Sequence, residues 1–158
     1  MRVTLPYGKE KVHFDVPDKN FIGMVDPPFV EQMENLPAAI ENAIDHPIGG
    51  KRLEEIIVPG KKIAIIVDDG SRPTPIATIL PILLPRIEKA GARPEDIRIV
   101  VALGSHRYMT EEELRERVGN AVYERYEVLN SEFQKPEGLV YVGDTPEGVK
   151  IMASKCVI

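Results

Sequence analysis

The chain has 158 residues, of which 43% are hydrophobic and 28% charged, a balance typical of one globular domain with a substantial core. Its 25 acidic and 20 basic residues give a net charge of -5, which argues against a nucleic-acid partner. Because Cys156 is the only cysteine, no disulfide forms within the chain, and we expect a cytoplasmic protein. No apolar run approaches the roughly 20 residues of a membrane helix, so no membrane partner is expected.

The first 20 residues follow the pattern of a β-hairpin. Val3 and Leu5 alternate with polar residues, as do Val12 and Phe14, and a proline and a glycine lie between the two runs. We therefore predict an N-terminal hairpin over residues 1–20.

Helical spacing follows the predicted hairpin. Apolar residues recur every three or four positions over 29–44, which predicts one or two helical segments with Pro37 as an interior interruption. A shorter pattern at 53–57 predicts a second helix, ended by the Pro-Gly pair at 59–60.

Residues 61–158 contain the same strand, loop and helix unit twice. Continuous apolar runs at 62–67 and 97–103 are typical of strands buried in a parallel sheet. The first is followed by a helix at 76–90, where Thr74 is expected to cap the helix and Pro81 and Pro85 to kink or split it.

The second unit ends in a helix whose first residues, Thr110 to Glu113, match a capping box. Three further short strands are predicted at 126–129, 139–142 and 149–153. The predicted fold class is α/β: a Rossmann-like, open, mainly parallel sheet with helices on both faces, together with the N-terminal β-hairpin.

Two polar loops follow the two buried strands, and in open parallel sheets ligands bind outside the carboxyl ends of the strands. The loop 68–74 offers Asp69, Ser71, Arg72 and Thr74 at the start of a helix, where an anion is favoured. The loop 104–109 offers His106 and Arg107, and an imidazole there could move a proton near neutral pH. Together the loops predict an anion clamp with a general base.

Structural roles for the same residues remain open at this point. Asp68 and Asp69 could cap the turn through backbone N–H groups, and Arg72 could form an ordinary ion pair. His106 could likewise be a surface histidine. His13 and His46 are assigned to structure, and Ser71 lacks the neighbours of an acyl-transfer nucleophile. Neither a dinucleotide-binding glycine motif nor a P-loop is present.

The segments 68–75 (DDGSRPTP) and 102–110 (ALGSHRYMT) resemble the N-terminal part of the lactate racemase family, as do their spacing and the strands that follow. The resemblance implies an isomerase, a racemase or epimerase of 2-hydroxyacids, that works by hydride transfer to a nickel-pincer nucleotide. It further implies that His106 is the first of two acid-base histidines, and that Arg72 with Asp69 binds the substrate carboxylate or the cofactor region. Ser71, Thr74 and Arg107 belong to the same matching motifs.

The departures from the family pattern bear on activity. The family's second histidine, nickel-binding histidine and cofactor-bearing lysine have no counterpart here, so we expect no metal ligand and no bound cofactor in this chain. The chain also stops on apolar Val157 and Ile158. We therefore expect a single N-terminal domain, 1–158, of a longer enzyme, inactive alone, with its own C-terminal domain as a partner and homo-oligomerisation left open.

Two other functions compete with the racemase. The first is a stand-alone module that binds a carboxylate or phosphate through the 68–74 loop without chemistry. The second is a hydrolase in which Asp68, Asp69 and His106 share a divalent cation. The identity of the 2-hydroxyacid is not indicated by these residues.

Overall fold

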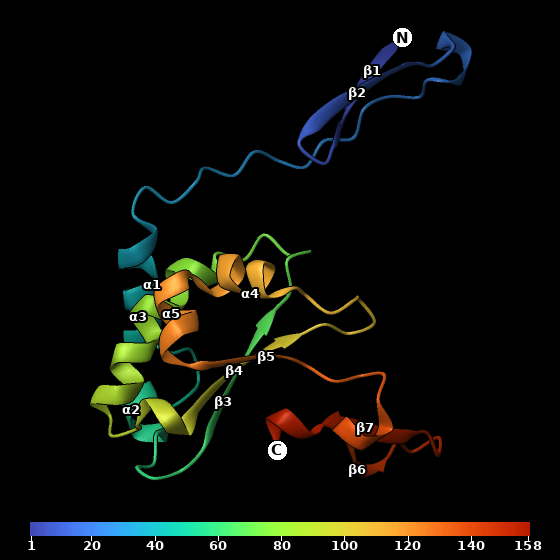
Figure 1. The fold of residues 1–158 in the computed structure, drawn as a ribbon. Helices are drawn as coiled ribbons and strands as arrows, with labels where there is room; N and C mark the ends of the chain where they lie inside the picture. The colour runs from blue at the N-terminus through green and yellow to red at the C-terminus, as the bar shows by residue number, and fades with distance from the viewer. The chain divides into compact units, whose positions relative to one another are not determined.

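The computed structural model describes residues 1–158, and the chain divides into two compact units, Met1–Gln32 and Met33–Ile158. Figure 1 traces the helices and strands of both units along the chain. None of the helices is long and apolar enough to cross a membrane.

The first unit contains the predicted hairpin. Strands β1 (Arg2–Tyr7) and β2 (Glu10–Asp15) pair antiparallel, and the short helix η1 (Asp18–Asn20) follows. In this register Leu5 lies opposite Val12, and Val3 opposite Phe14. One face of the hairpin is therefore apolar, which is the consequence of the alternation in the sequence.

The second unit begins with α1 (Leu36–Asp45) and α2 (Leu53–Ile56). Residues 21–35 form neither helix nor strand, so the predicted helical start at residue 29 is wrong. The helix begins later because Asn35 is its N-cap, with its side chain accepting from the Ala38 N–H at 3.1 Å. Pro37 therefore lies in the first turn, where a missing N–H costs nothing, and does not interrupt the helix.

A parallel sheet of three strands in the order β3-β4-β5 forms the centre of this unit. Its strands are β3 (Ile63–Asp68), β4 (Ile97–Ala102) and β5 (Glu127–Asn130). Helix α3 (Ile76–Lys89) connects the first two strands, and α4 (Glu111–Val118) with α5 (Asn120–Arg125) connects the last two. Both crossovers step in the same direction, so right-handed connections place these helices on the same face of the sheet (Figure 1).

The core lies between this face and the helices. Ile99 and Val101 of β4 are fully buried there, together with Leu80 and Leu84 of α3. On the other face Ile66 is 61% exposed, and the C-terminal helix η4 (Lys155–Val157) is bound to the sheet through the Arg98 guanidinium and the carbonyl of Cys156. The predicted α/β class, with a parallel sheet and an N-terminal hairpin, is confirmed, but the connecting helices α3, α4 and α5 cover one face of the sheet and not both.

Helix α3 is one continuous helix rather than two, although it contains Pro81 and Pro85. Both prolines lie on its exposed side, in line with Ala77. The carbonyl groups that lose an N–H partner therefore face water, which can satisfy them. The predicted capping role of Thr74 is wrong, because Pro75 is the N-cap and no side chain caps this helix.

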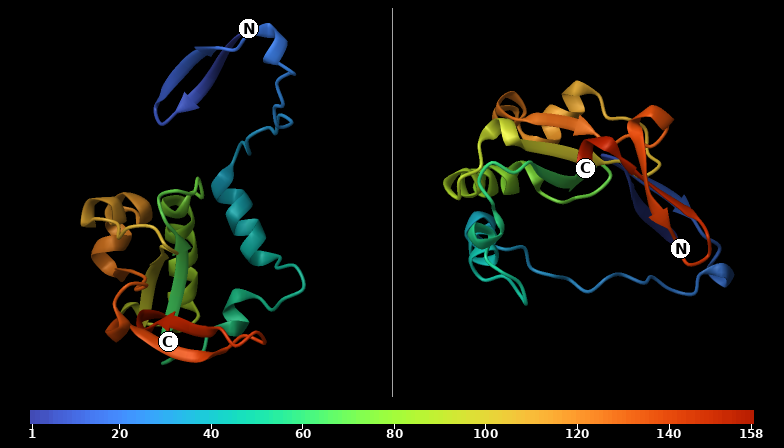
Figure 2. Two further views of the ribbon diagram at one scale, coloured as in Figure 1. Left: turned by 90° about the vertical axis from the view of Figure 1, so that its right-hand side faces the viewer. Right: turned by 90° about the horizontal axis from the view of Figure 1, so that it is seen from below.

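The last strands form a separate antiparallel pair, β6 (Leu139–Asp144) and β7 (Lys150–Ser154). Short helices η2 (Pro94–Asp96) and η3 (Pro136–Gly138) precede β4 and β6. In Figure 2 this pair crosses the sheet near the end where β3 begins. This pair therefore does not cover the carboxyl end of the sheet, where both polar loops emerge.

Candidate active site

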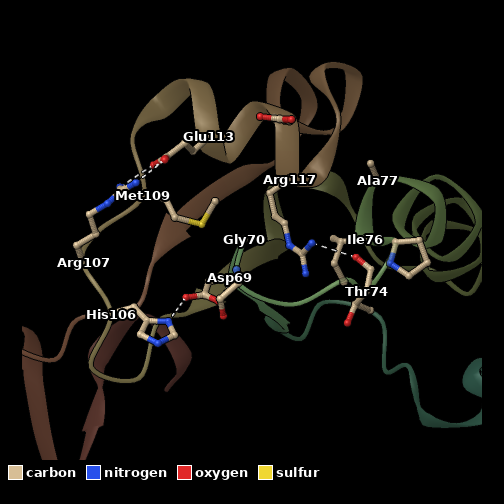
Figure 3. Close-up of a pocket in the computed structure, with 13 residues that line it drawn as sticks. Asp69, Gly70, Thr74, Ile76, Ala77, His106, Arg107, Met109, Glu113 and Arg117 are labelled. Atoms are coloured by element: carbon tan, nitrogen blue, oxygen red, sulfur yellow. Dashed lines mark hydrogen bonds and ion pairs between the residues drawn. The ribbon is translucent and has the colours of Figure 1, made fainter. Parts of the chain in front are cut away.

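The loops after β3 and β4 meet at the carboxyl end of the sheet, because these strands are neighbours. They border an open pocket of 810 Å³. Its wall includes Asp69, Ser71 and Thr74 from the first loop and His106 and Arg107 from the second. Figure 3 shows these loops on one side of the pocket and α4 on the other. Five of the six predicted site residues thus line one cavity.

The closest contact across the two loops joins Asp69 to His106, whose Nδ1 lies 2.5 Å from Oδ2 of Asp69 (Figure 3). The carboxylate also accepts from the Ser71 hydroxyl at 2.5 Å and from the Ser71 N–H at 3.1 Å. The hydrogen bonds from Ser71 and then from His106 lower the pKa of Asp69 to about 2. Asp69 is therefore ionised at neutral pH and can only accept hydrogen bonds.

This contact determines the tautomer of His106. Since an ionised carboxylate has no proton to donate, Nδ1 of His106 must carry the hydrogen of the pair. A neutral imidazole then has its lone pair on Nε2, which makes no hydrogen bond. Because the His106 side chain is 59% exposed, Nε2 is accessible to a small molecule in the pocket. In this arrangement Nε2 can accept a proton from a molecule bound in the pocket.

Local contacts fix the loop that carries His106. Gly104 adopts φ +59°, a left-handed conformation that costs glycine little, and the His106 N–H then donates to the Leu103 carbonyl at 3.0 Å. Asn130, at the end of β5, accepts from the Met109 N–H at 3.2 Å and donates to the Met109 carbonyl at 2.9 Å. The loop is thus held at both ends.

Tyr108 attaches the same loop to the segment after β5. Its hydroxyl donates to Glu132 at 2.5 Å, and this bond raises the pKa of Tyr108 to about 12. The ring also packs on Phe133, with ring centroids 5.4 Å apart. Tyr108 is therefore an anchor of the loop and stays protonated at neutral pH.

Asp68, in contrast, makes no hydrogen bond with the imidazole. Its carboxylate accepts from the Thr74 hydroxyl at 2.5 Å and from Arg117 of α4. Burial raises the pKa of Asp68, but the hydrogen bonds from Thr74 and Arg117 outweigh burial and lower it. Asp68 thus has structural contacts, but with side chains and not with the backbone N–H groups considered for turn capping; Asp69 makes a contact of that kind, with the Ser71 N–H. No three acidic, histidine or cysteine side chains are grouped as metal ligands, so the hydrolase alternative has no ligand set.

The three arginines near the pocket differ in their partners. Arg107 binds Glu113 through two hydrogen bonds of 2.8 and 2.6 Å (Figure 3), and Arg117 is paired with Asp68. The side chain of Arg72 is exposed and makes neither a hydrogen bond nor an ion pair, although it is not among the residues that line the pocket. Arg72 is therefore the one cation here that is free to bind an added anion.

Two predicted assignments of histidines to structure agree with their contacts. His13 bonds to the Thr4 hydroxyl within the hairpin, and His46 bonds to the Asn42 carbonyl at the end of α1. Sequence reasoning missed Arg117, which lines the pocket. The signal that could have found it is helical spacing, because Glu113, Glu116 and Arg117 all lie on the pocket side of α4.

Comparison with known proteins identifies the family. The family described as "Lactate racemase N-terminal domain" matches residues 7–158. The chain belongs to this family. Within it, a lactate racemase from Thermoanaerobacterium thermosaccharolyticum is 30% identical over 158 residues, which are 99% of this chain and 37% of that protein. One from Lactiplantibacillus plantarum is 32% identical over 155 residues, 97% of this chain and 36% of that protein.

A solved structure extends the likeness to the fold. The lactate racemase apoprotein from Thermoanaerobacterium thermosaccharolyticum matches with a TM-score of 0.73 and 30% identity, over 99% of this chain and 36% of that one. The family resemblance read from the two loop segments is thereby confirmed. The chain spans a little over a third of the length of these relatives.

Proposed function

We propose that this chain supplies the proton-transfer and carboxylate-binding part of the active site of a 2-hydroxyacid racemase or epimerase. The observation that carries the proposal is the 2.5 Å contact between Asp69 and His106 at the carboxyl end of the sheet. It leaves Nε2 without a hydrogen-bond partner on an exposed side chain that lines an open pocket, where we expect the hydroxyl of a small acid to reach it.

In this proposal each residue acts on a different atom of the substrate. Arg72 binds the carboxylate through its free guanidinium. His106 accepts the proton of the 2-hydroxyl at Nε2 when the acid is oxidised to a 2-oxoacid, and returns it when the acid is reformed. Asp69 orients the imidazole and stabilises it while it is protonated. Ser71 and Thr74 hold the two aspartates, and Arg107 holds the first turn of α4 through Glu113.

Oxidation of the substrate also requires an acceptor for the α-hydrogen. We infer from the family that this is a hydride transfer to a nickel-pincer nucleotide in a longer, full-length enzyme. The residues described here do not hold that group, because no lysine lines the pocket and no set of nickel ligands is present. We therefore expect the 158-residue chain alone to be inactive, and the missing tether and ligands to come from its C-terminal partner domain.

The test uses a full-length protein produced together with the cofactor pathway, supplied with single enantiomers of α-deuterated 2-hydroxyacids. Chiral chromatography with mass spectrometry then reports racemisation and label retention. Racemisation with the deuterium retained supports hydride transfer, whereas loss of the label to solvent indicates removal of a proton from the α-carbon. No turnover of any acid contradicts the racemase.

A separate binding experiment tests the anion-binding alternative. The observation in its favour is that the Arg72 side chain has no partner, because a free guanidinium can bind a carboxylate or phosphate without any chemistry. A module of this kind would bind these anions through the isolated chain, lose affinity in R72A and be indifferent to H106A. Isothermal titration of lactate and inorganic phosphate into the three proteins distinguishes it from the racemase.

A further inference from the structure

Arg117 of α4 makes an unusual number of contacts with the loop that precedes α3. Its Nε donates to the Asp68 carbonyl at 3.0 Å, and its Nη1 donates to the carbonyls of Arg72 at 3.2 Å and Thr74 at 3.0 Å. Its Nη2 donates to the carboxylate of Asp68. One guanidinium therefore binds the first, fifth and last residues of the 68–74 loop.

The side chain of Arg117 is only 11% exposed, and its helix is itself well fixed. Thr110 and Glu113 close the capping box at the start of α4, while Leu114 and Val118 are buried in the core. Arg117 thus connects a rigid helix to a loop whose own backbone bonds include the 3.2 Å contact from the Arg72 N–H to the Asp69 carbonyl.

The two functional residues of the loop depend on this connection. Asp69 directly follows Asp68, which Arg117 binds through both its carbonyl and its carboxylate. Arg72 is held by its own carbonyl, so its side chain starts from a fixed point although the guanidinium is free. A shift of this loop would lengthen the 2.5 Å contact between Asp69 and His106.

We propose that Arg117 is a positioning residue that holds the loop so that Asp69 meets His106 and Arg72 can receive a carboxylate. The importance of this role for catalysis rests on the proposed function, whereas the effect of Arg117 on the position of the loop does not depend on it. Lysine cannot replace arginine, because an ammonium lacks the planar fork that reaches four acceptors at fixed angles. The test therefore uses R117K, which keeps the charge, with R115K as a matched control on the same helix.

Arg115 is a suitable control because it contacts Glu111 and the ring of Tyr123 and makes no contact with the loop. The 158-residue chains are labelled with 15N-histidine, and long-range 1H–15N spectra report the tautomer of His106 at alkaline pH, where imidazoles are neutral. We expect the Nδ1–H form to predominate in wild type and R115K. In R117K the population should shift toward the Nε2–H form.

Circular dichroism shows whether each variant is folded. D68N is a second variant, which keeps Arg117 but replaces the carboxylate that it binds with a neutral amide. Its tautomer population should lie between those of wild type and R117K. A folded R117K with the wild-type tautomer overturns the proposal, and so does a D68N or R115K that shifts the tautomer more than R117K does.

The full-length enzyme provides the second readout. R117K should lower kcat/KM about 10-fold or more, since a small displacement of a catalytic group has effects of this size or larger, while R115K stays within about twofold. A full-length wild type that racemises no acid would contradict the proposed function. The tautomer shift in R117K would still establish the positioning role, so the two failures are distinguishable.

Discussion

Asp69 and His106 are 37 positions apart in the chain, yet Oδ2 of Asp69 lies 2.5 Å from Nδ1 of His106. The two residues belong to loops that leave adjacent parallel strands at the same edge of the sheet. The pair is thus a product of topology, since each loop by itself contains only half of it. Its chemical consequence is an imidazole with one nitrogen bound and the other free.

Replacement of Asp69 by asparagine should impair catalysis more than folding. An amide can donate to Nδ1, which reverses the tautomer and places the hydrogen on Nε2, where the substrate hydroxyl must deliver its proton. We expect kcat of the full-length enzyme to fall about 10²–10⁴-fold. Steady-state kinetics measures this, with E147Q, in an exposed turn, as a control that should behave as wild type. A D69N enzyme with full kcat would show that the imidazole does not depend on this pair.

Replacement of Arg72 by alanine should act mainly on substrate binding. A hydrogen bond to a charged group contributes roughly 1.5–3 kcal/mol, so we expect KM of the full-length enzyme to rise about 10–150-fold. R107A is the matched control, because Arg107 is already bound to Glu113 and its loss should affect the stability of α4 more than KM. Initial rates over a range of lactate concentrations provide both constants. An R107A variant with a larger increase in KM than R72A would reverse the roles given to the two arginines.

The stability of the chain should fall at acidic pH, and Asp96 should contribute to this fall. The guanidinium of Arg93 at 2.7 Å and the ammonium of Lys62 at 2.8 Å lower the pKa of Asp96 from 3.8 to about 2. On acidification the unfolded chain takes up this proton first, so the contribution present above about pH 4 is lost as the pH falls toward about 2. Asp69, whose pKa is also lowered to about 2, has the same sign.

Urea unfolding at several pH values between 7 and 2 measures this dependence. D96N should be less stable than wild type near neutral pH and should lose less stability on acidification, because the group that takes up the proton is absent. E147Q should retain the wild-type slope. A D96N variant with an unchanged slope would mean that Asp96 does not contribute to the acid sensitivity.

The regular parts of the core and the place of the site could be predicted from the sequence. The β-branched runs predicted β3 and β4, and the capping box at Thr110 is present with both of its hydrogen bonds. The strand order could then place Asp69 and His106 at one edge, since parallel neighbours end on the same side. These features depend on local pattern and on topology, which a single sequence contains.

Contacts between distant polar side chains could not be predicted in this way. Arg117 bonds to Asp68, which lies 49 positions earlier in the chain. From sequence alone, an arginine in a helix rich in charged residues is expected to be exposed to solvent. Similarly, Arg107 lies in one of the two motifs that resemble the family, and its guanidinium is bound to Glu113, six residues further on. Such pairings follow from how α4 packs beside the loops, and this packing is determined only by the whole unit.

A matched pair of core substitutions tests the asymmetry of the sheet. Ile99 of β4 is fully buried against the helices, whereas Ile66 of β3 lies on the opposite face and is 61% exposed. I99A should therefore lower the free energy of unfolding of the 158-residue chain by about 2–5 kcal/mol, because it leaves a cavity. I66A should cost less than about 1 kcal/mol, because water already contacts this side chain. Urea unfolding measures both, and equal losses would show that the face of Ile66 is also buried in solution, for instance by association of two chains.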